Sequence, residues 1–346
     1  MAKRALAVGI TTAAAVAASV VHGPTAASAQ PTGPKFVRVV CDARNSGVAL
    51  TGCVAARAVR VEGGPASGVA DADAAYEQVG RVMDFYARLV PGGVGSLIGA
   101  PGRDGSPAAI RITVRACSFF QACPMVNAFW SQGEHAMFLG AGFSRAFDVI
   151  AHELTHGVTA ATSRLVYSGE SGAINESMSD VLAELAEQTE FGLHSAWVMG
   201  EDLHVPGVPN PIRDLADPTR PLAGPGTGQP DRMGSPLYKR AKACSDLNDY
   251  CFVHRNSGVG NKTAYLIAVG GTFSGLRIVG IGVAKASKLY WSVENRLGPR
   301  ASYATLGRTL LTACNALRRD VKLTQRFTAG DCATVKQAAR ATGIVA

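Results

Sequence analysis

The spacing of apolar residues changes near the middle of the chain, and this change limits the folds open to it. Before Ser144, short runs alternate apolar and polar residues with the period of a β-strand, as in 109–115. From Phe147 onward, apolar residues recur three or four positions apart, as on an amphipathic helix. With 346 residues, of which 47% are hydrophobic, the chain can bury a large core. We expect an α+β protein with a β-rich N-terminal lobe over 30–160 and a mainly α-helical C-terminal lobe over 161–346.

Local patterns predict the elements of these lobes. An amphipathic helix is expected over 70–89, with Asp71 and Asp73 as its caps, and 109–115 is expected to be a half-buried strand. A turn at Gly47 should join short strands within 35–61. Other strands are predicted at 127–130 and 135–139, further helices at 284–297, 303–317 and 333–341, and a loop rich in glycine and proline at 217–236.

The first residues have the layout of a secretory signal peptide. Lys3 and Arg4 precede a run rich in alanine and valine that ends in the small residues Ala27-Ser28-Ala29, which are typical of a cleavage site. An uncleaved anchor is the alternative, but Gly23 and Pro24 interrupt an already short run. We expect cleavage after Ala29 and a secreted protein without a membrane anchor.

The cysteines agree with export to an oxidising compartment. There are eight of them, in pairs that are close in sequence: Cys41 with Cys53, Cys117 with Cys123, Cys244 with Cys251, and Cys314 with Cys332. Four disulfides are the natural hypothesis, although proximity alone leaves the connectivity open. Cysteine zinc sites, the alternative, would require C-x-x-C spacing, which the sequence lacks.

Charge excludes one class of partner. The net charge is +8, but lysine and arginine are spread along the chain rather than clustered, so the charge favours solubility or loose attraction to anionic surfaces over nucleic-acid binding. We expect a monomer that binds neither nucleic acid nor membrane.

A short motif at the start of the helical half can bind a metal. In the run His152-Glu153-Leu154-Thr155-His156, the two histidines lie four positions apart and therefore share one face of a helix. There they can hold one zinc ion, with Glu153 beside an open coordination position. Such a run also arises by chance on helix surfaces, so a third ligand decides.

Glu176 is the candidate for that ligand. It lies on a second predicted helix whose apolar residues would pack it against the first, so that Glu176 and Asp180 share the opposite face. Asp180 and Asn175 could then accept hydrogen bonds from the outer N–H groups of the histidines and fix their tautomers. The alternative is that Glu176 is a solvated helix charge.

These two runs, 152–159 and 171–180, resemble the zinc-binding segments of the thermolysin family of neutral metallopeptidases. The similarity extends from about Asp71 to the C-terminus and includes 200–202, 213, 217–218, 253–258, 261–262 and 264–267. The resemblance implies a thermolysin-like fold whose active-site helix forms the floor of a cleft between the lobes. It also implies a zinc-dependent endopeptidase with one catalytic zinc.

The resemblance also implies roles for single residues. Glu153 would be the general base that takes a proton from the water activated by zinc. His254 and Tyr167 would donate hydrogen bonds to the oxyanion that forms during hydrolysis, and Asp249 would orient His254.

The substrate is implied to bind as an extended strand. Asn127 and Ala128 match an edge strand whose backbone pairs with a peptide, and Arg213 would hold a substrate carbonyl. An apolar pocket would prefer a bulky apolar residue after the scissile bond, although its positions could instead be ordinary core. These positions are Val149, Met199 and Ile212.

The chain departs from the family at its calcium sites. Asp148, Glu187 and Glu201 match three calcium ligands, but Ala196 and Val198 stand where two more oxygens are expected. Since calcium requires six to eight oxygen ligands, the resemblance implies one calcium ion or none rather than two. The disulfides could replace the stability that is lost.

A second departure lies near the start. Relatives often carry a long pro-region, whereas 30–70 has room only for short strands. We expect the chain to fold without a large pro-domain.

Three functions fit these features. The leading one is an endopeptidase that acts on proteins or peptides outside the cell. A second is a secreted zinc-binding protein that serves adhesion or inhibition without turnover. A third keeps the chemistry but acts on peptide cross-links of a cell wall, which the positive charge would suit.

Overall fold

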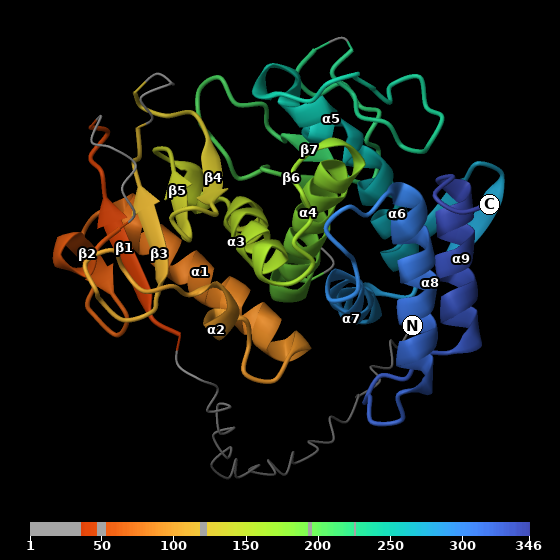
Figure 1. The fold of residues 1–346 in the computed structure, drawn as a ribbon, viewed down its shortest axis with the longest axis horizontal. Helices are drawn as coiled ribbons and strands as arrows, with labels where there is room; N and C mark the ends of the chain where they lie inside the picture. The colour runs from red at the N-terminus through yellow and green to blue at the C-terminus, as the bar shows by residue number, and fades with distance from the viewer. Residues whose placement is uncertain (1–35, 47–52, 118–122, 193–195, 225) are drawn as a thin grey trace, which may run out of the picture. The chain divides into compact units, whose positions relative to one another are not determined.

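The computed structural model describes residues 36–46, 53–117, 123–192, 196–224 and 226–346 (Figure 1). The predicted signal peptide over 1–29 and the predicted turn at Gly47 lie outside these residues. Among the described residues, no helix is both long and apolar enough to cross a membrane.

A mixed five-stranded sheet occupies the N-terminal part. Its strands follow the order β2-β1-β3-β5-β4, and β1, β3 and β5 run parallel, whereas β2 and β4 pair antiparallel at the two edges. Their bounds are β1 (Arg38–Asp42), β2 (Ala58–Val61), β3 (Ile110–Val114), β4 (Ala128–Ser131) and β5 (Ala136–Leu139). The strand predicted at 109–115 is confirmed as β3, but its predicted half-burial was wrong, because β3 is central and all five of its residues are buried. Strand β4 keeps one free edge within this sheet.

Helix α1 (Ala70–Leu89) packs against β1 and β3 and has the predicted bounds. Its predicted caps were wrong, because the helix is preceded by Val69 and makes no side-chain cap. Instead, the Asp73 carboxylate accepts hydrogen bonds from the backbone of Ser67 and Gly68, and Asp71 accepts one from Ser144. The two aspartates therefore tie neighbouring loops to the first turn of the helix.

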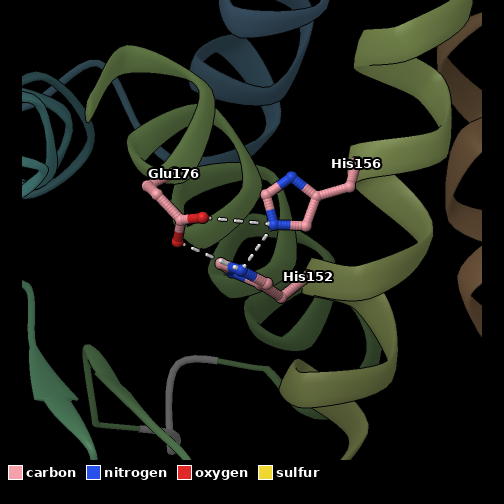
Figure 2. Close-up of side chains that lie close together, drawn as sticks. All are labelled: His152, His156 and Glu176. Atoms are coloured by element: carbon pink, nitrogen blue, oxygen red, sulfur yellow. Dashed lines mark hydrogen bonds and ion pairs between the residues drawn. The ribbon is translucent and has the colours of Figure 1, made fainter. Parts of the chain in front are cut away.

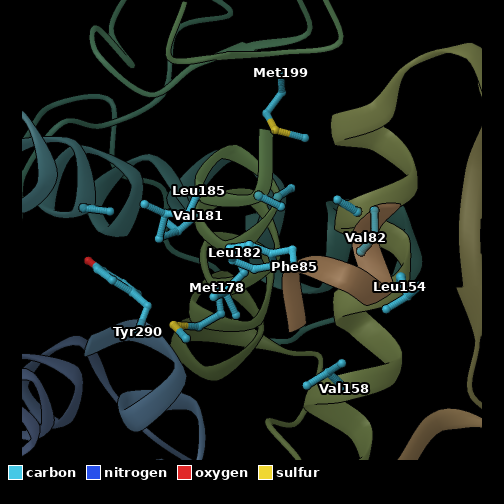
Figure 3. Packing of buried hydrophobic residues seen from close by; sticks show 14 of the residues in the cluster. Val82, Phe85, Leu154, Val158, Met178, Val181, Leu182, Leu185, Met199 and Tyr290 are labelled. Carbon is cyan, nitrogen blue, oxygen red and sulfur yellow. The ribbon is translucent and has the colours of Figure 1, made fainter. Parts of the chain in front are cut away.

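Two long helices form the centre of the fold. Helices α3 (Phe147–Ala161) and α4 (Gly169–Phe191) pack side by side, with α1 against α3 and α7 against α4 (Figure 1). Every residue of α4 from Ser171 to Gln188 is buried, so its polar face does not meet solvent as on an ordinary amphipathic helix. Leu154 and Val158 of α3 belong to the same core as Met178 and Leu182 of α4 (Figure 3). This packing fixes the two helices against each other.

The C-terminal part is mostly helical. Apart from short 3-10 helices and α2 (Gly95–Ile98), which precedes β3, the remaining elements are β6 (Val198–Met199), β7 (Arg213–Asp214), α5 (Asp249–Asn256), α6 (Gly258–Ala268), β8 (Gly270–Phe273), β9 (Leu276–Val279), α7 (Val283–Glu294), α8 (Tyr303–Arg319) and α9 (Ala329–Ala341). The sequence patterns did not predict α5, α6 or the hairpin of β8 and β9. The described residues of the predicted loop 217–236 contain neither helix nor strand, as expected. The α+β class, with a β-rich start and a helical second half, is confirmed.

All eight cysteines form disulfides, and each is joined to the cysteine nearest to it along the chain. The bonds are Cys41–Cys53, Cys117–Cys123, Cys244–Cys251 and Cys314–Cys332. The pairing by proximity is therefore confirmed.

Candidate metal centre

Helices α3 and α4 bring three possible metal ligands together (Figure 2). His152 and His156 lie one turn apart on α3, and their Nε2 atoms are 3.0 Å from each other. Glu176 faces them from α4, with one carboxylate oxygen 3.5 Å from His152 Nε2 and the other 3.5 Å from His156 Nε2. The three donors converge on one point because the two helices are packed rigidly together.

This donor set fits zinc. A tetrahedral zinc ion with bonds of about 2.0 to 2.2 Å places its ligand atoms roughly 3.3 to 3.6 Å apart, close to the separations found here. Glu176 and His152 are buried, His156 is half-buried, and one Glu176 oxygen has no hydrogen-bond partner. A cation between them would satisfy all three.

The outer nitrogens of the histidines are held by acceptors, as predicted from the helix faces. Asp180 Oδ1 lies 2.8 Å from His152 Nδ1, and Asn175 Oδ1 lies 2.8 Å from His156 Nδ1. Because each Nδ1 then carries the hydrogen, each Nε2 can offer its lone pair to a metal. Ser179 Oγ, 3.2 Å from His156 Nδ1, is a further contact that the sequence did not predict.

The charges around the histidines shift their pKa values. Burial lowers the pKa of His152, but the carboxylates of Asp180 and Glu176 outweigh it and raise that pKa to about 10. Burial raises the pKa of Glu176, but the nearby histidines His254, His152 and His156 hold it well below its usual value. The pocket therefore favours a negative carboxylate beside a positive charge, and a metal ion can supply that charge.

Asp180 is the centre of a buried polar network. Burial raises its pKa, but Arg213 and His152 lower it to about 2, so the carboxylate stays ionised. The Arg213 guanidinium donates two hydrogen bonds to it, of 2.9 and 2.6 Å, and Asn261 Nδ2 donates a third of 2.8 Å. The network links α3, α4, α6 and β7 at one carboxylate.

A cavity of about 900 Å³ opens beside the three donors. It is lined on one side by residues of β4 and on the other by residues around α5, and both Asn127 and Ala128 lie at its edge. Ala128 lies on β4, one of the two edge strands of the sheet.

Four residues predicted to bind substrate are not among the described residues that line this cavity, namely Arg213, Val149, Met199 and Ile212. The Arg213 side chain is mostly buried against Asp180. Val149 and Met199 belong to the hydrophobic core, where Figure 3 labels Met199, and Ile212 packs against that core.

Glu153 lies in the cavity next to the donors and is oriented by a contact that the sequence did not predict. The backbone N–H of Trp130 donates a 2.9 Å hydrogen bond to the Glu153 carboxylate. The Trp130 ring lies so close to Gly157 on α3 that an added Cβ would come within 2.8 Å of it. The absence of a side chain at position 157 therefore allows β4 to approach the helix.

Tyr167, His254 and Asp249 meet on the opposite side of the cavity. The Tyr167 hydroxyl lies 3.2 Å from His254 Nε2 and donates a short hydrogen bond to Glu176. Burial raises the pKa of Tyr167, so its hydroxyl keeps the proton and remains a donor. Asp249 Oδ1 lies 2.6 Å from His254 Nδ1. Burial lowers the pKa of His254, but Glu176 and Asp249 outweigh it and raise that pKa, which favours the protonated imidazole.

A second group of carboxylates lies away from this cavity. Asp148, Glu187 and Glu201 each bring an oxygen to within 4.8 Å of the others. Burial, with added repulsion from neighbouring carboxylates, raises their pKa values, to about 6 for Asp148, about 9 for Glu187 and about 7 for Glu201. One oxygen of Glu187 and one of Glu201 are buried without a hydrogen-bond partner. This group can hold a hard cation such as calcium.

Other residues, at the cavity or in the polar network behind it, had no role predicted from the sequence. Trp130 acts through its backbone, which no side-chain motif reveals. Asn261 was part of the family resemblance but had no assigned role. Tyr250, which lines the cavity and contacts the Tyr167 ring edge-on, lies in a segment that no periodic pattern marked.

Comparisons with known proteins agree with this geometry. A model of the alpha-helical domain of thermolysin metallopeptidases matches residues 163–343, and a model of their catalytic domain matches residues 65–160. The chain is 39% identical over 329 residues to a zinc metalloproteinase from Renibacterium salmoninarum, covering 89% of this chain and 57% of that protein. It is 34% identical over 291 residues to thermolysin from Alicyclobacillus acidocaldarius subsp. acidocaldarius, covering 81% of this chain and 48% of that protein. The chain spans about half the length of the curated relatives it matches.

A solved structure is similar as well. The precursor of protealysin, a metalloproteinase from Serratia proteamaculans, superimposes with a TM-score of 0.67 and 28% sequence identity. The match covers 91% of this chain and 89% of that chain.

The network around Asp180 predicts an effect on metal affinity. Asp180→Asn should weaken zinc binding about 10- to 100-fold, because the amide no longer provides the charge that orients and polarises His152. Competition with a chromophoric chelator measures the affinity. Asp231→Asn is the control, since Asp231 is a buried carboxylate outside the site that pairs with Arg232. An unchanged affinity in a folded Asp180→Asn protein would show that Asp180 does not support the metal.

Proposed function

The chain belongs to the thermolysin family of metallopeptidases, and on this premise we propose that it is a zinc-dependent endopeptidase that hydrolyses peptide bonds in proteins or peptides. The observation that carries the proposal is the convergence of His152, His156 and Glu176 beside Glu153 at the wall of an open cavity. Family membership and the three donors together imply a catalytic zinc ion.

When bound, zinc supplies a Lewis acid that makes a water molecule acidic near neutral pH and polarises the carbonyl of the peptide bond. Glu153 is the group that takes the proton from the attacking water and can pass it to the leaving amine. The hydrogen bond from the Trp130 backbone holds the Glu153 carboxylate toward the cavity. One oxygen is thereby fixed while the other remains available for proton transfer.

Tyr167 and His254 stabilise the negative charge that develops on the carbonyl oxygen. Their donor groups lie 3.2 Å apart, so both can reach one oxygen atom between them and the metal ligands. Asp249 holds the His254 ring so that Nε2 faces the cavity.

The peptide substrate lies along the free edge of β4. The sheet order leaves the outward backbone groups of this strand without a neighbouring strand, and Ala128 and Trp130 both line the cavity there. An extended peptide can therefore add to the sheet as one more strand, which places its backbone beside Glu153. The division into lobes at 30–160 and 161–346 belongs to the same proposal, since the cavity draws its lining from both.

We also propose that the protein acts outside the cell. Four disulfides hold the described part of the chain together, and disulfides persist in oxidising compartments and are rare in the cytosol.

Removing the general base tests the mechanism. Glu153→Gln should lower the rate of casein cleavage by at least about 100-fold while zinc stays bound, because the amide cannot accept the proton from water. Metal content and casein digestion of the purified protein measure the two effects. Glu190→Gln is the matched control, since Glu190 lies at the end of α4 and pairs with Arg81.

The outcomes separate the candidate functions. An unchanged rate in Glu153→Gln would refute the mechanism. A wild-type protein that binds zinc but cleaves nothing would favour a binding role in adhesion or inhibition. Cleavage of cell-wall peptides without cleavage of casein would favour a wall-specific enzyme.

The substrate preference is a separate part of the proposal. A bulky apolar residue is expected after the scissile bond, because Val149, Met199 and Ile212 match the apolar pocket of the family, although here they belong to or pack against the core and are not among the described residues that line the cavity. Mass-spectrometric mapping of the cuts in a denatured protein mixture should show leucine, isoleucine, phenylalanine or valine enriched at that position. Cuts that are independent of that residue would contradict the preference, while leaving the hydrolytic mechanism intact.

The second carboxylate group is proposed to bind one calcium ion. Three carboxylates can offer up to six oxygens, which suffices for one calcium ion but not for two. Their unpaired buried oxygens support a cation, because burying carboxylates together without one is costly.

Calcium removal should therefore destabilise the protein in a pH-dependent way. Without calcium, the raised pKa values of Asp148, Glu201 and Glu187 mean that the folded state binds more protons than the unfolded state between about pH 4 and about pH 9. The free energy of unfolding of the calcium-free protein should fall as pH rises through this window. Calcium should oppose the fall by binding the deprotonated carboxylates.

Thermal melting at pH 5 and pH 8 measures this effect, on protein treated with EDTA and then given back zinc alone. The melting temperature should drop far more at pH 8 than at pH 5, and Glu187→Gln should reduce the difference between calcium-loaded and calcium-free protein. Equal melting with and without calcium would contradict the site and indicate that the disulfides supply the stability instead.

A further inference from the structure

The first four residues of α5, which precede His254, form a turn whose backbone is not that of a right-handed helix. Four consecutive residues adopt left-handed conformations, with φ angles of 52° at Asp249, 48° at Tyr250, 72° at Cys251 and 63° at Phe252. Such angles suit glycine, but each of these residues carries a Cβ that clashes with its own backbone there. A run of this kind persists only where other contacts enforce it.

Those contacts come from the segment just before the turn. The Cys244–Cys251 disulfide joins this segment to the third residue of the turn, with the Cα atoms 4.8 Å apart. Tyr250 N–H donates a 2.7 Å hydrogen bond to the Ser245 carbonyl, and Cys251 N–H donates one of 3.0 Å to Asn248 Oδ1. The disulfide is the only covalent contact among them.

The turn places Asp249 against His254 in two ways. One carboxylate oxygen lies 2.6 Å from His254 Nδ1, and the other accepts a 3.0 Å hydrogen bond from the His254 backbone N–H. Yet the side chains of His254 and Asp249 are 50% and 36% exposed, so burial alone does not hold them. His254 Nε2 also contacts Tyr167 and Glu176, but the position of Asp249 against the ring depends on the backbone of the turn.

We propose that the Cys244–Cys251 disulfide holds this strained turn closed, and that Cys244 and Cys251 are thereby positioning residues for the Asp249–His254 pair. The inference rests on the proposed function, in which His254 donates to the oxyanion. Without the disulfide the turn relaxes toward ordinary backbone angles, Asp249 moves away from His254, and the imidazole loses its orientation toward the cavity. The zinc ligands keep their positions because α3 and α4 hold them, and only the contact between His254 and Glu176 is lost.

Two variants that lack only the Cys244–Cys251 disulfide, and that differ from each other at position 251, test the proposal. Cys244→Ala with Cys251→Ala should lower kcat about 10- to 100-fold, the scale expected when a catalytic group is misplaced by about 1 Å. KM and zinc content should change little, because His254 acts mainly on the transition state. Cys244→Ala with Cys251→Gly should recover a large part of kcat, because glycine accepts a φ of 72° without strain.

The control removes a disulfide far from the cavity. Cys314→Ala with Cys332→Ala breaks the bond between α8 and α9, which should lower the melting temperature but leave kcat per folded molecule unchanged. If the Cys244→Ala, Cys251→Ala protein keeps the wild-type kcat, or if glycine at position 251 performs no better than alanine, the proposal is wrong.

A spectroscopic readout separates this inference from the proposed function. The ¹⁵N chemical shifts of the His254 ring report its hydrogen bond to Asp249 whether or not the protein cleaves casein. They should move toward those of a solvated imidazole in the alanine variant and return in the glycine variant. A wild-type protein without turnover would overturn the peptidase proposal, whereas His254 shifts that stay the same in all three proteins would overturn the positioning role.

Discussion

Two imidazole nitrogens and a carboxylate can share one buried point only when a positive charge lies among them. The Nε2 atoms of His152 and His156 are 3.0 Å apart. One carboxylate oxygen of Glu176 lies 3.5 Å from the first nitrogen, and the other oxygen lies 3.5 Å from the second. In the low dielectric of the interior, unpaired lone pairs this close are costly. When no metal is bound, a proton on His152 supplies this positive charge. The carboxylates of Asp180 and Glu176 favour that proton and raise the pKa of His152 to about 10. A zinc ion would displace that proton and bind all three donors at once.

Asp180 connects the histidine to a second positive charge. Its carboxylate faces His152 on one side and the Arg213 guanidinium on the other, while Asn261 donates a further hydrogen bond. A buried pair such as Asp180 with Arg213 adds little net stability compared with apolar packing. Its function is better explained as support for the metal, because it keeps a fully charged acceptor beside the histidine. Arg213 therefore contributes to the site even though it does not line the cavity.

The sequence predicted the parts of the site that depend on local geometry. His152, His156 and Glu176 follow from helix periodicity, because α3 and α4 are regular and residues four apart must share a face. The contacts that escaped prediction depend on elements distant in sequence or on irregular backbone. The Trp130 N–H reaches Glu153 only because β4 is an edge strand near α3, and the left-handed residue Tyr250 follows no period at all. The strand over 109–115 was assigned as half-buried because alternation cannot reveal that a strand is central in its sheet.

Two clusters of buried acidic residues show why burial alone does not set the charge of an acidic side chain. Glu176 and Asp180 are fully buried, yet their pKa values are lowered, because cationic or N–H donor groups face them. Asp148, Glu187 and Glu201 are also removed from solvent, and their pKa values are raised by that burial and by repulsion from neighbouring carboxylates. The first group has its compensating charge within the protein, whereas the second must take up protons or a cation. A cation is the only one of these partners that can keep all three carboxylates ionised at neutral pH, so the stability of this region should depend on the ions around the protein more than that of the catalytic helices does.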